Sequence, residues 1–169
     1  MAKDRAAGTL ADQQSGPLKV LIADDNPTDR MILARLVSRL GHAVISAENG
    51  LEALVQFSVE KPDLVLLDAL MPVMDGFEAA RRMKLQSGEN LIPIIFLTSL
   101  TETDALVQCL EAGGDDFLTK PYNPVILQAK IQAFNRMQEM HQTLQDQRDL
   151  ISGQHERLLH EQHLANVIY

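Results

Sequence analysis

The feature that most constrains the fold of this chain is a regular alternation between short apolar runs and longer segments with helical periodicity. The apolar runs are continuous, whereas a half-buried strand would alternate apolar with polar side chains. Continuous runs are typical of strands in a parallel sheet that is covered on both faces. The runs that we interpret as strands are 18–23, 43–46, 64–67, 94–97 and 117–118.

The segments between these runs carry helical patterns that stop at glycine or proline. We expect helices over 27–40, 50–60, 77–85 and 103–112, and a last helix that begins after Asn123 with Pro124 in its first turn. Because parallel strands need crossover connections, five strands alternating with five helices predict a doubly wound α/β domain. In such folds the functional site lies beyond the carboxyl ends of the strands.

The composition indicates a soluble, cytoplasmic protein. Its 169 residues are 46% hydrophobic, which is enough for one domain with a sizeable core plus an appendage. The formal net charge of −8 makes nucleic acid an unfavourable partner for this chain. No run is apolar enough to span a membrane, and residues 1–16, which we interpret as a disordered lead-in, lack the apolar stretch of a signal peptide. The single cysteine, Cys109, excludes an internal disulfide.

Polar side chains follow four of the five expected strands. They are Asp24 and Asp25 after the first, Asp68 after the third, Thr98 and Ser99 after the fourth, and Lys120 after the fifth. Three carboxylates at one sheet edge repel each other unless a cation joins them, and their hard oxygens suit Mg²⁺. A lysine and a hydroxyl that face the same cluster fit a phosphoryl group. The set therefore indicates phosphoryl transfer onto a carboxylate.

Four stretches of the sequence resemble the receiver domain of two-component response regulators. The stretches are LIADDNPTDR, LVLLDALMPVMDGFE, IIFLTSL and GGDDFLTKPYNP, and the likeness covers about residues 18–135. The resemblance implies a flavodoxin-like receiver fold, with a five-stranded parallel sheet of order 2-1-3-4-5. It also implies that a sensor histidine kinase or a phosphotransfer protein supplies the phosphoryl group.

The resemblance assigns roles to the acidic residues. Asp68 would be the phosphoacceptor. Asp25, assisted by Asp24, would bind Mg²⁺ together with Asp68 and the backbone carbonyl of Leu70.

The remaining site residues are also assigned by the resemblance. Thr98 would hydrogen-bond a phosphoryl oxygen, Lys120 would pair with it, and the Lys120–Pro121 peptide bond would be cis. Phe117 occupies the place of the switch aromatic, where family members often have tyrosine. A phenylalanine has no hydroxyl to satisfy when it turns inward, so burial of the ring alone must drive the switch.

Beyond the receiver, which we place at residues 17–136, the helical pattern continues to the end of the sequence, and only Gly153 interrupts it. Apolar and polar residues alternate at the two core positions of a heptad. The apolar ones are Met137, Leu144, Ile151, Leu158 and Ala165, and the polar ones are His141, Arg148, His155 and Gln162. This pattern describes a weak coiled coil. We interpret residues 137–169 as a stalk that joins two identical chains, with a solvated helical tail as the alternative.

Two functions fit these features. In the first, the chain is a phosphorylation-dependent switch that drives an output through its helical stalk. In the second, it is a stand-alone phosphorelay intermediate without an output of its own. The long heptad helix favours the first and indicates a linker to an absent effector domain. The resemblance suggests an enzymatic output, such as a PP2C-type phosphatase or a diguanylate cyclase. The chain itself would carry no enzyme beyond Mg²⁺-dependent self-phosphorylation and autodephosphorylation.

Overall fold

The structure is a computed structural model that describes residues 16–88, 90, 92–99 and 103–168; the side chains at 142, 145 and 152–168 lie outside this description. The chain divides into two compact units, one that runs to Asn135 and one that begins at Arg136. The lead-in expected at residues 1–16 falls almost wholly outside the described residues. No helix in the described part of the chain is long and apolar enough to cross a membrane.

The first unit is built on one parallel sheet of five strands, in the order β2-β1-β3-β4-β5. Every neighbouring pair of strands is parallel. The predicted doubly wound sheet of order 2-1-3-4-5 is therefore confirmed. The strands are β1 (Lys19–Ala23), β2 (Ala43–Ala47), β3 (Leu64–Asp68), β4 (Ile94–Thr98) and β5 (Asp116–Thr119).

Helices connect the strands and begin at capping side chains. Asn26, Asn49 and Asp75 each accept a hydrogen bond from a backbone N–H in the helix that they precede. Asn123 likewise accepts from the backbone N–H of Val125 at 2.8 Å, at the start of the last helix. The helices are α2 (Pro27–Arg39), α3 (Gly50–Glu60), α4 (Gly76–Ser87), α5 (Thr103–Glu111) and α6 (Pro124–Ile168).

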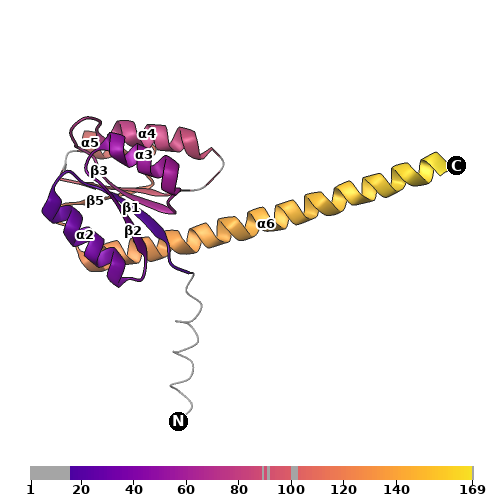
Figure 1. Cartoon of the computed structure of the whole chain (residues 1–169), viewed down its shortest axis with the longest axis horizontal. Helices are drawn as coiled ribbons and strands as arrows, with labels where there is room; N and C mark the ends of the chain where they lie inside the picture. The colour runs from indigo at the N-terminus through magenta and orange to yellow at the C-terminus, as the bar shows by residue number, and fades with distance from the viewer. Residues whose placement is uncertain (1–15, 89, 91, 100–102, 169) are drawn as a thin grey trace, which may run out of the picture. The chain divides into compact units, whose positions relative to one another are not determined.

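Two apolar cores cover the two faces of the sheet (Figure 1). On one face α3, α4 and α5 contribute Phe57, Met83 and Cys109. On the other, α2 contributes Leu33 and the start of α6 contributes Leu127. Strands β3 and β4 are buried along their whole length, which is why they appear in the sequence as continuous apolar runs. The layers hold the carboxyl ends of β1, β3, β4 and β5 at one edge of the sheet.

The second unit consists of the part of α6 from Arg136 onward, within a helix of 45 residues. Three of its apolar heptad residues are exposed: Met137 by 52%, Leu144 by 63% and Ile151 by 66%. The Nε2 atom of His141 is buried and has no hydrogen-bond partner among the described residues.

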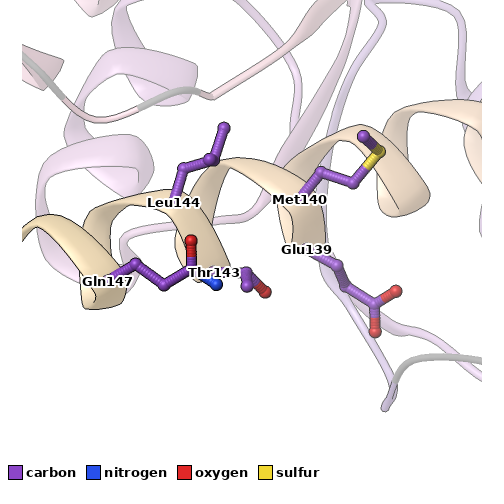
Figure 2. Close-up of a pocket in the computed structure, with 5 residues that line it drawn as sticks. All are labelled: Glu139, Met140, Thr143, Leu144 and Gln147. Atoms are coloured by element: carbon purple, nitrogen blue, oxygen red, sulfur yellow. The ribbon is translucent and has the colours of Figure 1, made fainter.

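A hollow of about 690 Å³ lies along this part of α6, and Figure 2 shows the residues that line it. Met140 and Leu144 point to the same side of the helix, whereas Glu139 points away from them. The other lining residues, Thr143 and Gln147, belong to the same helix. Because one helix supplies all five residues, the hollow is an open helix surface rather than an enclosed site.

Candidate functional site at the carboxyl edge of the sheet

The structure brings the three predicted aspartates together. Asp24 and Asp25 follow β1, and Asp68 is the last residue of β3, the strand next to β1 in the sheet. One carboxylate oxygen from each of the three lies within 4.8 Å of the others. The clustering follows from topology, because the carboxyl ends of neighbouring parallel strands meet at one edge.

Asp68 lies in a largely desolvated position. Its relative exposure is 8%, and its Oδ1 atom accepts a hydrogen bond from the backbone N–H of Leu70 at 3.4 Å. Burial raises the pKa of the Asp68 carboxyl to about 6; Lys120 opposes this rise, and the negative charge of Asp24 adds to it. The carboxylate is thus poorly hydrated, although 12% of its side chain remains exposed.

Asp24 is fully buried, and both of its carboxylate oxygens have partners. Oδ1 accepts from the backbone N–H of Asn26 at 2.9 Å, and Oδ2 accepts from Nζ of Lys120 at 2.8 Å. The Arg30 guanidinium also donates to the backbone carbonyl of Asp24, at 2.7 Å. Asp25, by contrast, is exposed to solvent. The two neighbouring aspartates therefore differ in how freely they can accept a new ligand.

Lys120 is the cation at the centre of the acidic cluster. Besides Asp24, its Nζ atom lies 3.3 Å from Oδ2 of Asp29 and 3.5 Å from Oδ2 of Asp68. Burial alone would lower the pKa of the ammonium, but the surrounding carboxylates outweigh it and raise the pKa above its usual value. Lys120 therefore stays charged at any physiological pH.

Thr98 and Phe117 lie on neighbouring strands beside the cluster. Thr98 ends β4, is buried, and accepts a backbone hydrogen bond from Lys120 at 2.7 Å through its carbonyl. Phe117 lies on β5 opposite Phe96 of β4 and packs against the α3–α4–α5 core. The Lys120–Pro121 peptide bond is cis, as the resemblance implied.

Two features of the site were not predicted from the sequence. One is Asp29, which reaches Lys120 from the first turn of α2. The other is the close approach of Gly76 to the site: a Cβ at this position would lie 2.1 Å from the backbone oxygen of Asp68. The sequence feature that could have indicated Asp29 is its position four residues after Asp25, on a helix that begins at the same edge of the sheet.

The donor set fits a hard divalent cation. It consists of carboxylates from Asp24, Asp25 and Asp68, which are the oxygen ligands that Mg²⁺ prefers. Lys120 supplies only one positive charge against them, so a divalent cation would relieve the remaining repulsion. These residues can hold a metal ion.

Comparison with known proteins agrees with this geometry. Residues 20–132 match the model of the response regulator receiver domain. The probable transcriptional regulator ycf27 of Cyanophora paradoxa is 39% identical over 121 residues, which are 72% of this chain and 49% of the relative. The regulatory protein PhoP of Bacillus subtilis, named for alkaline phosphatase synthesis, is 37% identical over 122 residues, 72% of this chain and 50% of the relative. The chain thus spans about half the length of the curated relatives it matches.

Solved structures show the same likeness. The chemotaxis protein CheY4 of Vibrio cholerae has a TM-score of 0.66 and 31% identity, and the match covers 70% of this chain and 99% of that one. A CheY-like receiver domain from Methanospirillum hungatei has a TM-score of 0.68 and 29% identity, over 75% of this chain and 99% of that one. Fold, acidic cluster and sequence agree, and the chain belongs to the response regulator receiver family.

Proposed function

We propose that this receiver accepts a phosphoryl group from a histidine kinase or a phosphotransfer protein on the side chain of Asp68. An oxygen of the Asp68 carboxylate attacks phosphorus, the bond from phosphorus to the donor nitrogen breaks, and the imidazole leaves with the electron pair and takes up a proton. The product is an aspartyl phosphate. The observation that carries the proposal is the burial of Asp68 beside Lys120 within the acidic cluster.

Asp24, Asp25 and Asp68, with the backbone carbonyl of Leu70, would hold Mg²⁺ in this proposal. The ion would neutralise the charge of the carboxylates and of the incoming phosphoryl group. The clustering of the three carboxylates supports this Mg²⁺ site. Lys120 complements the metal with a fixed charge, because its pKa is raised and it does not lose its proton near neutrality.

The phosphorylated state would be recognised by Thr98 and Phe117. A hydrogen bond from Thr98 to a phosphoryl oxygen would draw the end of β4 toward the site, and the half-buried ring of Phe117 on β5 would turn inward to fill the space. A phenylalanine has no hydroxyl that needs a hydrogen-bond partner, so only burial of the apolar ring favours the inward position. The change would reach the surface around α5 and β5.

The long helix α6 favours a switch that acts on an output linked to the receiver through this helix. The exposed residues Met137, Leu144 and Ile151 recur at heptad spacing, and a second copy of the same helix would bury them in a dimeric stalk. The related proteins are named transcriptional regulators. Their names favour gene regulation over the enzymatic outputs expected from the sequence. A chain with a net charge of −8 binds DNA poorly, so this receiver would act on a DNA-contacting region other than itself.

Acetyl phosphate, a small phosphoryl donor, tests the proposed reaction without a kinase. We expect the intact protein to gain one phosphoryl group in the presence of Mg²⁺, and to gain none when EDTA is added or when Asp68 is replaced by asparagine. Asp25→Ala should weaken Mg²⁺ binding. Undiminished labelling of Asp68→Asn, measured by mass spectrometry, would show that the acceptor is elsewhere.

A further inference from the structure

Asp29 is the carboxylate near Lys120 for which the proposed reaction has no use. It lies in the first turn of α2, where the Asn26 side chain accepts a hydrogen bond from the backbone N–H of Asp29 at 3.2 Å. Its Oδ2 atom is 3.3 Å from Nζ of Lys120, and its side chain is 37% exposed. A rigid helix end thus places a half-hydrated carboxylate against the cation of the site.

Three carboxylates lie within hydrogen-bond distance of the Lys120 ammonium. The partner carboxylates are Asp24 at 2.8 Å, Asp29 at 3.3 Å and Asp68 at 3.5 Å. Lys120 therefore lies closer to the first two than to the phosphoacceptor. A phosphoryl oxygen on Asp68 would be a further acceptor beside these three, and an ammonium has only three protons to donate, so the phosphoryl group would compete with the carboxylates for Lys120.

Asp24 is poorly suited to release the lysine. It is fully buried, so water could not replace the ammonium as a partner of its Oδ2 atom. Asp29 differs because more than a third of its side chain is already in solvent, which can hydrate the carboxylate after the lysine leaves. The contact from Lys120 to Asp29 is therefore the one that breaks at the lowest free-energy cost.

We propose that Asp29 is a positioning residue that holds Lys120 in the unphosphorylated state and competes with the phosphoryl group for it. This inference rests on the proposed function of Asp68. Asp29 then lowers the affinity of the site for a phosphoryl group and raises the threshold for activation. In the phosphorylated protein the Asp29 carboxylate is released at the start of α2.

Binding of beryllofluoride, a stable mimic of a phosphoryl group on a carboxylate, measures this competition directly. The mimic is titrated into the full chain at a saturating, fixed Mg²⁺ concentration, and the adduct is observed by ¹⁹F NMR. We expect Asp29→Asn to bind it about three- to tenfold more tightly than the wild type, the effect of removing one partly exposed ion pair that competes with binding. Asp29→Glu, which keeps the charge, should return the affinity toward the wild-type value.

Glu48→Gln is the matched control. Glu48 lies just after β2 at the same edge of the sheet, and its partner is Arg30, at 3.4 Å, rather than Lys120. The Glu48→Gln substitution also removes one negative charge but does not free Lys120. The affinity of this variant for beryllofluoride should therefore stay within about twofold of the wild-type value.

The outcomes separate this inference from the reaction on which it rests. Tighter binding by Asp29→Asn alone supports the competition, and damage to the fold would not produce a gain in affinity. If Asp29→Asn and Glu48→Gln changed the affinity for beryllofluoride equally, the change would come from net charge rather than from the contact of Asp29 with Lys120, and the inference would be overturned. Unchanged or weaker binding by Asp29→Asn, in a protein whose wild type forms the adduct, would overturn it as well. A wild type that forms no adduct at all would overturn the proposed function of Asp68, and the inference with it.

Discussion

The three aspartates of the acidic cluster differ in their surroundings, although all of them lie at one sheet edge. Asp24 is buried with both oxygens paired, Asp68 is buried with a pKa raised to about 6, and Asp25 is exposed. The differences suit different tasks. In the proposed reaction, the fixed carboxylate would orient the lysine, the poorly hydrated one would react, and the exposed one would be open to a metal.

The raised pKa of Asp68 predicts a stability cost that depends on pH. An unfolded aspartate has a pKa near 3.8, whereas burial raises that of folded Asp68 to about 6. The folded protein therefore holds this proton more tightly, and the wild type loses stability as pH rises from about 4 to about 6. A shift of this size corresponds to about 3 kcal/mol at most, which partial solvent access reduces to roughly 1–2 kcal/mol.

We therefore expect Asp68→Asn to be more stable than the wild type by roughly 1–2 kcal/mol at pH 7.5 in EDTA, with the difference vanishing below about pH 4. Urea unfolding at a series of pH values checks this. Asp149→Asn, which removes an exposed carboxylate far from either end of α6, is the control and should leave the profile unchanged. Equal stability of Asp68→Asn and wild type at pH 7.5 would contradict the desolvation of Asp68.

Single residues of the site were predictable where a strand alone positions them. Asp24, Asp68 and Lys120 follow apolar runs, and the topology of a parallel sheet then brings them to one edge. Asp29 was missed because its contact with Lys120 depends on how near the first turn of α2 lies to the end of β5, and a helical pattern does not specify that distance. The roles assigned to these residues stay predictions until phosphorylation is measured.

At the scale of elements, the sequence predicted the type and order of every strand and helix in the first unit. The bounds differ by one or two residues, at the ends of the strands and of three helices. The helix expected at 77–85 begins instead at Gly76, because Asp75 caps it, and ends at Ser87. Apolar runs and helical periods specify what forms, whereas the ends depend on hydrogen bonds that the pattern does not contain.

The start of α4 predicts a position at which only glycine fits. A Cβ at Gly76 would lie 2.1 Å from the backbone oxygen of Asp68 and 3.0 Å from Cα of Ala69, both of them backbone atoms in the segment after β3. We expect Gly76→Ala to lose about 2 kcal/mol or more of unfolding free energy, because α4 must move away from the acceptor. Urea denaturation checks the loss.

Gly16→Ala is the control for this substitution, since a Cβ there meets no atom within 4 Å. It should change stability by less than about 0.5 kcal/mol. If the Gly76→Ala variant were as stable as the Gly16→Ala variant, this result would contradict the close packing of α4 against the end of β3.

At the scale of the whole molecule, the exposed apolar residues of α6 recur at heptad spacing. Met137, Leu144 and Ile151 bury apolar area only against another helix, and the identical chain is the partner that the pattern favours. We expect the full chain to dimerise at tens of micromolar, and a version that ends at Arg136 to remain monomeric. Sedimentation velocity, with and without phosphorylation, distinguishes the two states.

A pair of leucine substitutions makes this test specific to the heptad face. Leu144 lies at a heptad core position, whereas Leu150 is equally exposed, at 64%, but lies outside the core positions. Leu144→Gln should weaken the dimer and Leu150→Gln should not. A full chain that sediments as a monomer would show that the segment is a solvated helical tail.

The central claim is that Asp68, and neither of its two acidic neighbours, carries the phosphoryl group. Borohydride reduces an aspartyl phosphate to homoserine, which marks the acceptor permanently and can be located by tandem mass spectrometry after proteolysis. After treatment with acetyl phosphate and Mg²⁺, we predict homoserine at position 68, with Asp24 and Asp25 unchanged. Homoserine at position 24 or 25, or at no position in a protein that has gained a phosphoryl group, would contradict the account.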